Sequence, residues 1–197
     1  MATPAAPAGL RIGLMGGSFN PPHAGHVAVA RAAMRRLELD RLWLLVSPGN
    51  PLKSHNELAR LDDRVTSLQR LLHSRRMLAT GIEARLGTRY TVDTLAVLRR
   101  RFPAARFVWV MGADGLAEMH RWRNWREIAS LVAIAVVDRP RWRFKALASP
   151  AARTLARSRL DERLAARLPF IEPPAWTYLS IRLSPQSSSA IRARMRP

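Results

Sequence analysis

The chain has 197 residues, no cysteine and a formal net charge of +19, and 48% of its residues are hydrophobic. This length suits one domain with a buried core, and the absence of cysteine excludes disulfide frameworks, thiol nucleophiles and cysteine-based zinc sites. All but two of the 33 basic residues are arginines, and they are spread along the chain without a dense tail, so charge alone identifies no partner.

The first nine residues are rich in Ala and Pro, and we expect a flexible N-terminal tail there, followed by a single domain over residues 10–197. This start lacks the basic residues of a signal peptide, and no apolar run is long enough to cross a bilayer. We therefore expect a cytoplasmic protein with no membrane partner.

The remaining sequence alternates between short strand-like runs and amphipathic, helix-like stretches. In chain order we expect strand Leu10–Met15, helix Ala24–Leu37, strand Arg41–Val46, helix Arg60–Ser74, strand Met77–Glu83, helix Thr91–Phe102, strand Arg106–Met111, a short helical stretch rich in Trp, strand Leu131–Val137, helix Ser149–Leu168, strand Thr177–Leu183 and a short terminal helix. Because such alternation with right-handed crossovers favours parallel strands, the pattern predicts an α/β fold with a Rossmann-like open parallel sheet flanked by helices.

The most informative stretch is Gly16-Gly17-Ser18-Phe19-Asn20-Pro21-Pro22-His23-Ala24-Gly25-His26. It follows an expected strand and opens an expected helix, where backbone N–H groups and the helix dipole attract phosphate. The two glycines let the backbone approach a ligand, and His23 and His26 share one face of the first helical turn. Their imidazoles can donate hydrogen bonds to phosphate oxygens. The run is neither a Walker A loop nor a G-x-G-x-x-G motif.

A second candidate motif lies near the C-terminus, at Gln186-Ser187-Ser188-Ser189-Ala190-Ile191-Arg192. Consecutive serines before a helix supply an N-cap and free N–H groups. Arg192, one turn further on, supplies a forked cation for a phosphate.

Together the two motifs resemble the signatures of the nucleotidylyltransferase superfamily, (T/H)-x-G-H and Ile-Ser-Ser-Thr-x-Ile-Arg. The first is similar to the nicotinate-nucleotide adenylyltransferase branch, and the resemblance runs from Gly16 to Arg192. Gln186 stands where the family usually has an aliphatic residue. Ser189 replaces Thr and keeps its hydroxyl, so the phosphate-binding role is expected to survive.

The resemblance implies catalytic roles for His23, His26 and Arg192: His26 at the α-phosphate of ATP, His23 at the neighbouring phosphates, and Arg192 with Ser188 at the β- and γ-phosphates. It also places Asp114 of Gly112-Ala113-Asp114 at the sugar hydroxyls and Arg139 near the adenine. The full set of ATP-binding residues that it implies is Gly16, Gly17, Ser18, Phe19, Gly25, Gly112, Asp114, Arg139, Ser187, Ser188 and Ser189.

For the second substrate, Tyr90-Thr91-Val92-Asp93-Thr94-Leu95 resembles the family segment Ser-Tyr-Thr-x-x-Thr-Leu, whose backbone contacts the pyridine substituent at the position of Thr91. Trp122 resembles the tryptophan that stacks on the pyridine ring, and Lys53 stands where relatives have His or Lys for substrate phosphates. The implied pyridine nucleotide-binding residues are Asn20, Lys53, Tyr90, Thr91, Trp122 and Arg123.

The reaction implied is the transfer of AMP from ATP to nicotinate mononucleotide, which yields nicotinate adenine dinucleotide, a precursor of NAD, and pyrophosphate. No covalent nucleophile is needed, because the phosphate of the mononucleotide can itself attack. Mg²⁺ is expected to be carried by the ATP phosphates, with no dedicated metal ligands from the protein.

Three alternatives remain open at this point. The acceptor could be nicotinamide mononucleotide or phosphopantetheine, although enzymes for the latter usually carry Thr at the position of His23 and have shorter chains. From a different class, a basic nucleic-acid-binding protein is supported only by the charge, and we expect no specific nucleic-acid partner.

Overall fold

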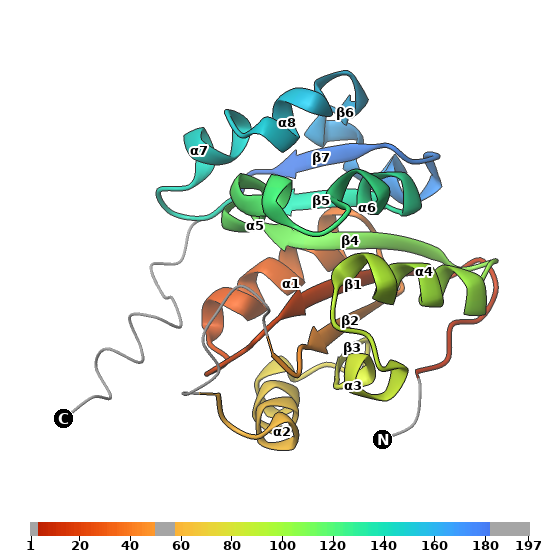
Figure 1. Ribbon diagram of the computed structural model, residues 1–197, viewed down its shortest axis with the longest axis vertical. Coiled ribbons are helices and arrows are strands. Elements are labelled where there is room, and N and C mark those ends of the chain that lie inside the picture. Colours follow the sequence, from red (N-terminus) through yellow and green to blue (C-terminus); the bar gives the residue numbers. More distant parts are fainter. Residues whose placement is uncertain (1–3, 50–57, 182–197) are drawn as a thin grey trace.

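A computed structural model describes residues 4–49 and 58–181 and arranges seven strands in one parallel sheet, in the order β3-β2-β1-β4-β5-β7-β6 (Figure 1). The strands are β1 (Arg11–Gly17), β2 (Arg41–Val46), β3 (Met77–Thr80), β4 (Arg106–Gly112), β5 (Ala133–Val137), β6 (Arg159–Leu160) and β7 (Trp176–Leu179). Every strand pair is parallel, so the expected α/β fold with an open parallel sheet is confirmed.

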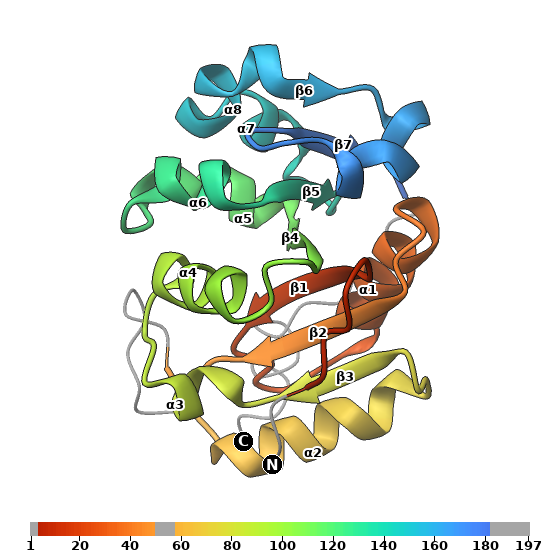
Figure 2. The same ribbon diagram turned by 90° about the vertical axis from the view of Figure 1, so that its right-hand side faces the viewer.

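Helices cover both faces of the sheet, as Figure 2 shows with the sheet between its helical layers. The α-helices are α1 (Ala24–Arg36), α2 (Leu61–Leu72), α3 (Ile82–Leu86), α4 (Thr91–Arg101), α5 (Ala113–Glu118), α6 (Trp125–Leu131), α7 (Arg143–Leu147) and α8 (Pro150–Thr154). Three 3₁₀ segments add to them: η1 (Met119–Arg121), η2 (Ala156–Ser158) and η3 (Glu162–Phe170). Helices α1 and α2 and segment η3 pack on one face, and the other helices pack on the opposite face.

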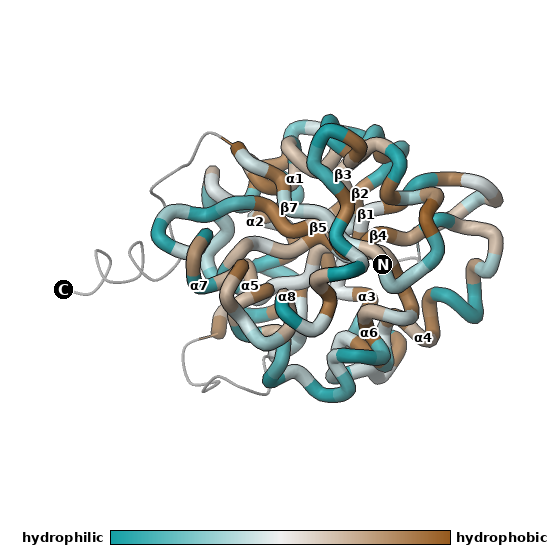
Figure 3. Tube along the Cα trace, turned by 90° about the horizontal axis from the view of Figure 1, so that it is seen from above, coloured by the Kyte–Doolittle hydropathy of each residue, from teal (hydrophilic) through white to brown (hydrophobic). Residues whose placement is uncertain are grey.

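Side chains of each central strand alternate between two hydrophobic cores. In β2, Trp43 and Leu45 enter the core beneath α4, whereas Leu42 and Leu44 enter the core beneath α1. Because both faces are buried, the central strands are apolar at nearly every position. Figure 3 shows these hydrophobic stretches at the centre of the molecule, with hydrophilic segments towards its periphery.

The strand order reverses direction between β1 and β4. From β1 the chain builds outward through β2 to β3, and from β4 it builds the other way through β5. In open α/β sheets, ligands bind at such a switch point, outside the carboxyl ends of the strands. The loop after β1 and the turn after β4 meet at this crevice, and these are the segments that carry the first motif and Asp114.

Most expected elements are found within one or two residues of their predicted bounds, including α1, β2, α2, α4 and β4. The strand expected at Met77–Glu83 ends earlier, at Thr80, because Gly81 is the N-cap of helix α3. The strand expected from Leu131 begins at Ala133, since Leu131 closes α6. The short helix α7 was not expected, and the predicted terminal helix lies outside the described residues.

The prediction of one helix over Ser149–Leu168 is wrong. This segment is divided among α8, η2, the edge strand β6 and η3. Side chains of β7 take backbone carbonyls that a continuous helix would use: Trp176 Nε1 donates to the carbonyl of Leu155 at 2.7 Å, and Thr177 Oγ1 donates to that of Leu160 at 3.0 Å. Tertiary contacts therefore override the helix propensity of an Ala- and Leu-rich sequence.

The segment expected to be a tail contacts the domain in its described part. Pro4 is buried, and the Gly9 N–H donates to the carbonyl of Ala104 at 2.8 Å. In the parts of the chain that the structure describes, no helix is both long enough and apolar enough to span a bilayer.

Candidate active site

The first motif forms the connection from β1 to α1. Phe19 adopts a left-handed backbone conformation (φ 46°) that is uncommon for a residue other than glycine, and its ring is fully buried. Gly16 is required by a close approach, because a Cβ there would lie 2.6 Å from the ring of Trp109. A Cβ on Gly17 would lie 3.1 Å from the ring of Phe19. The loop thus packs closely against aromatic rings. Ser18, between Gly17 and Phe19, is half-buried.

His23 and His26 cap helix α1 together. The Gly25 N–H donates to Nδ1 of His23 at 3.1 Å, and the His23 N–H donates to Nδ1 of His26 at 3.2 Å. Since Nδ1 accepts a hydrogen bond in both rings, each neutral imidazole carries its proton on Nε2. The two rings lie 3.8 Å apart, and Nε2 of His23 is buried without a partner in the described residues. Nε2 of His23 is thus a buried N–H donor that has no partner among the described residues.

The environment keeps both imidazoles neutral. Burial, with a smaller contribution from Arg139, lowers the pKa of His23 to about 4. Burial, followed by the nearby His23 and then Arg139, lowers the pKa of His26 to about 3. At neutral pH these groups act as hydrogen-bond donors rather than as cations.

Arg139 and Asp114 form an ion pair beside the histidines, between the segments that follow β5 and β4. Arg139 Nη1 lies 2.6 Å from Asp114 Oδ2. Gly112 permits this contact, because a Cβ there would lie 2.4 Å from Asp114 Oδ1 and 2.6 Å from Arg139 Cδ. The structure thus brings together four of the residues expected at ATP, namely His23, His26, Asp114 and Arg139.

The residues expected at the pyridine ring lie on the helical layer that contains α4 and α6. The Arg123 guanidinium lies over the ring of Tyr90, 4.7 Å from its centroid, and Thr91 begins α4. Trp122 is half-buried and meets Trp109 edge-to-face, at 6.4 Å between ring centroids. Through Trp109 this group adjoins Gly16 and the first motif.

Sequence reasoning missed two buried charged side chains close to these segments. Arg64 of α2 is 3% exposed and donates to the carbonyls of Ser18, Ser47 and Ala59. Asn20, expected at the pyridine nucleotide, accepts from the N–H of Ala59 at 3.3 Å. Arg64 falls on the apolar stripe of its helix, and a charge at such a position is the signal that could have identified it.

The second buried charge is Glu83, at the start of α3. Its Oε1 accepts from the Thr94 hydroxyl at 3.3 Å, and the Thr94 hydroxyl lies 2.8 Å from that of Thr88. The Thr94 N–H donates to the carbonyl of Tyr90. This chain of contacts holds the segment that leads into Tyr90 and Thr91. Burial raises the pKa of Glu83 to about 7, while the Thr94 hydrogen bond acts in the opposite direction.

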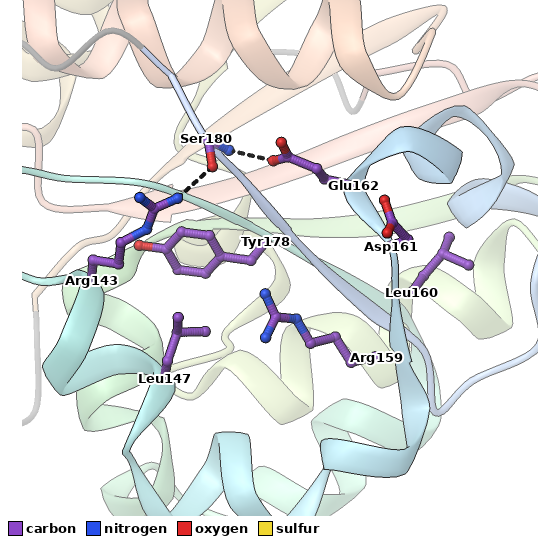
Figure 4. A pocket seen from close by; sticks show the side chains of 8 residues that line it. All are labelled: Arg143, Leu147, Arg159, Leu160, Asp161, Glu162, Tyr178 and Ser180. Carbon is purple, nitrogen blue, oxygen red and sulfur yellow. Dashed lines mark hydrogen bonds between the residues drawn. The ribbon is translucent and has the colours of Figure 1, made fainter.

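A pocket of about 470 Å³ lies at the carboxyl end of β7, between α7 and β6 (Figure 4). The Tyr178 hydroxyl donates to the buried Asp138 at 2.6 Å, and Arg143 Nη2 donates to the Ser180 hydroxyl at 2.6 Å. The Ser180 N–H donates to Glu162 Oε2 at 2.8 Å. These contacts anchor the strand end from which the sequence continues towards the second motif, and sequence analysis pointed to none of these residues.

Five predicted site residues lie outside the described residues: Lys53, Ser187, Ser188, Ser189 and Arg192. Within the described ranges, no three His, Asp or Glu side chains gather as a metal site.

Comparisons with known proteins show the family of this chain. Residues 14–194 match a family model described as cytidylyltransferase-like. The chain is 52% identical to a protein of Methylorubrum extorquens (strain PA1), and the match covers 94% of this chain and all of the other. It is 50% identical to a protein of Brucella suis biovar 1, and the match covers 93% of this chain and 94% of the other. Both are named "Probable nicotinate-nucleotide adenylyltransferase".

Among solved structures, the fold is similar to that of Plasmodium falciparum nicotinic acid mononucleotide adenylyltransferase. The form complexed with NaAD has a TM-score of 0.67 at 18% sequence identity, and the form complexed with APC has a TM-score of 0.65 at 17% identity. Each comparison covers 93% of this chain and 83% of the other. At this identity the similarity concerns the fold.

Proposed function

The chain belongs to the nicotinate-nucleotide adenylyltransferase family, and from this membership and the site we propose that it transfers AMP from ATP to nicotinate mononucleotide. The products are nicotinate adenine dinucleotide and pyrophosphate, which places the reaction in NAD biosynthesis. A cytoplasmic location is part of the proposal.

The observation that carries this proposal is the pair of neutral imidazoles at the switch point of the sheet. Two Nε2–H donors lie beside the cationic Arg139, and one of them has no partner in the described residues. A site of hydrogen-bond donors with a nearby cation suits the oxygens of a phosphate chain, on which negative charge grows during transfer.

In the proposed reaction, an oxygen of the mononucleotide phosphate attacks the α-phosphorus of ATP in line. A P–O bond forms to that oxygen while the bond from the α-phosphorus to the bridging oxygen breaks, and pyrophosphate leaves. His26 donates to the α-phosphate and His23 to the neighbouring phosphates, while Arg192 and Ser188 receive the β- and γ-phosphates. Mg²⁺ carried by ATP would offset part of the negative charge of the phosphates, without dedicated ligands from the protein. The protein contributes positioning and charge stabilisation.

On the pyridine side, Trp122 stacks on the ring, and backbone N–H groups near Thr91 and Arg123 receive the carboxylate. The position of the Arg123 guanidinium over Tyr90 supports an anionic ligand, because it adds positive charge to this end of the site. A charge-assisted hydrogen bond contributes about 1.5–3 kcal/mol, so nicotinate is favoured over the neutral nicotinamide by about tenfold to a hundredfold.

The test is a coupled assay of pyrophosphate release with nicotinate mononucleotide, nicotinamide mononucleotide and phosphopantetheine as acceptors. We expect the highest kcat/KM with nicotinate mononucleotide.

His26→Ala is expected to lower kcat by about 10²-fold, which is the effect of losing one contact to the transition state. Trp122→Ala is expected to weaken the binding of both mononucleotides, because stacking depends on the pyridine ring and not on its substituent. Equal kcat/KM on the two mononucleotides would overturn the nicotinate assignment, and near-normal turnover in folded His26→Ala would overturn its role at the α-phosphate.

A further inference from the structure

A buried network of side chains holds the carboxyl end of strand β5. Its centre is Asp138, which is 6% exposed and directly follows the strand. Asp138 Oδ1 accepts from the Tyr178 hydroxyl at 2.6 Å, and its Oδ2 lies 3.6 Å from Arg143 Nε. The Asp138 N–H donates to the carbonyl of Leu179 at 2.9 Å. Both the backbone and the side chain of Asp138 are therefore tied to β7, with a further contact to α7.

Tyr178 is a well-oriented donor in this network. It is 3% exposed, and the Arg143 guanidinium lies over its ring, 5.7 Å from the centroid (Figure 4). Burial, followed by the hydrogen bond to Asp138, raises the pKa of Tyr178, so its hydroxyl is protonated and donates at neutral pH. A short bond from a hydroxyl to a carboxylate is roughly twice as strong as one between neutral groups.

This side-chain bond is additional to the pairing of the strands. Backbone hydrogen bonds already join β5 to β7, in a register that ends at Val137 opposite Leu179. The bond from Tyr178 acts one residue further on, where the chain leaves the sheet. It therefore restricts the strand end, and not the strand pairing as such.

The residue that follows Asp138 is Arg139, and the two side chains contact opposite neighbours of β5. Asp138 is bound to β7, whereas Arg139 Nη1 lies 2.6 Å from Asp114 Oδ2, which follows β4. A turn begins at once, because the Trp142 N–H donates to the Arg139 carbonyl at 3.1 Å. The backbone of Arg139 is thus fixed by Asp138 on one side and by this turn on the other.

The position of Arg139 affects the two histidines. Its positive charge is one of the causes that lower the pKa of both His23 and His26, so it acts on both imidazoles. Because the interaction between charged groups depends on their separation, a displaced guanidinium would change the electrostatics of the site. A displacement would also alter the ion pair with Asp114.

We propose that Tyr178 is a positioning residue for Arg139: its hydrogen bond to Asp138 fixes the end of β5 and thereby holds the Arg139 guanidinium beside Asp114 and the two histidines. This inference rests on the proposed adenylyltransferase function. Tyr178 acts through Arg139, and not by contact with a substrate.

The test is a double-mutant cycle with Tyr178→Phe and Arg139→Gln, in which kcat and both KM values are measured for the wild type, the two single variants and the double variant. Phenylalanine keeps the ring and removes only the donor. We expect Tyr178→Phe to lower kcat/KM for ATP by about fivefold or more, because small misplacements in a site are costly. In the Arg139→Gln background the same change has an effect of less than about twofold, since there is no guanidinium left to position.

An equal effect of Tyr178→Phe in both backgrounds would overturn the inference, because the two side chains would then act independently. Wild-type kinetics of either single variant would overturn it as well. If Tyr178→Phe does not fold, Asp138→Ala takes its place in the cycle, since it removes the acceptor of the same bond. If the wild-type enzyme forms no dinucleotide from nicotinate mononucleotide, the proposed function has failed instead.

Thr177→Val is the matched control, because Thr177 is the neighbouring residue of β7 and is fully buried. Its hydroxyl donates to the carbonyl of Leu160 in β6, on the side of β7 away from β5. The variant therefore removes a buried hydroxyl hydrogen bond of the same strand without touching the network around Asp138. We expect wild-type kinetic constants and a loss of stability in urea unfolding. A fall in kcat/KM as large as that of Tyr178→Phe would show a general effect of loosening β7 and would contradict the proposal.

Discussion

Glu83 shows how burial alone can set the protonation of a side chain. It is 7% exposed, and burial raises its pKa to about 7 from an ordinary value of 4.5. Between these two values the folded protein retains a proton that the unfolded chain has released. Stability linked to Glu83 is therefore present at low pH and is lost as the pH rises through about 7.

We predict that Glu83→Gln is about as stable as the wild-type protein at pH 5 and more stable at pH 8, by on the order of 1–3 kcal/mol. Glutamine keeps the Oε1 acceptor for Thr94 and has no charge to bury. Urea unfolding at the two pH values measures the difference, and Glu118→Gln provides the same chemical change at an exposed side chain. A stability difference between Glu83→Gln and wild type that does not change with pH would contradict this account.

At the scale of elements, the start of helix α1 combines a structural role with a chemical one. Nδ1 of His23 caps the helix by accepting from the Gly25 N–H, while its Nε2 remains for a ligand. A helix cap requires only an acceptor at this position, and Asn supplies one as well as His does. The two roles can therefore be separated by substitution.

His23→Asn is expected to retain most of the stability of the helix start but to lose activity by on the order of 10²-fold, because no group replaces the Nε2 donor. His23→Ala should lose a similar amount of activity and a further ~1 kcal/mol of stability with the cap. Steady-state kinetics and urea unfolding of both variants measure the two effects. Equal stability of the Asn and Ala variants would show that the cap contributes little, and near-normal turnover of His23→Asn would remove the histidine from the site.

For the whole molecule, the binding of anionic substrates depends more on where the positive charges lie than on the total charge. Strands β1, β2 and β4 each begin with an arginine: Arg11, Arg41 and Arg106. Because the strands are parallel, these residues lie at the amino edge of the sheet, opposite the site. A strand of seven residues spans about 23 Å, well beyond the Debye length of about 8 Å at physiological salt.

We predict that the double variant Arg41→Gln/Arg106→Gln keeps kcat/KM for ATP within about twofold at 0.15 M salt, because dissolved ions screen the interaction between charges at the amino edge and substrates in the site. The single variant Arg139→Gln should lower it by about tenfold or more, since a charge-assisted contact is lost. Both are measured in the same pyrophosphate assay. A comparable loss in the double variant would mean that the distributed charge attracts the substrates, which its distance argues against.

The sequence alone was sufficient for the features that depend on local pattern. The periodicity of apolar residues predicted α1, β2, α4 and β4 closely, because helices and buried strands leave direct signatures in the chain. The first motif predicted that His23 and His26 lie together at the start of a helix, since the glycines, their spacing and the strand-to-helix context are all adjacent in sequence. The chemistry expected there follows from the residue types themselves.

Other features were decided only by contacts between distant parts of the chain. The strand order, the division of residues 149–168, and the burial of Arg64 and Glu83 each depend on partners that are far away in sequence or were not recognised there. The Trp176 side chain donates a hydrogen bond to the Leu155 carbonyl, and Arg64 donates to the carbonyls of Ser18 and Ser47. Likewise, the low pKa values of the two histidines arise mainly from burial, with a contribution from Arg139. Desolvation and hydrogen bonding are properties of the packed structure, and no local pattern encodes which groups will share them.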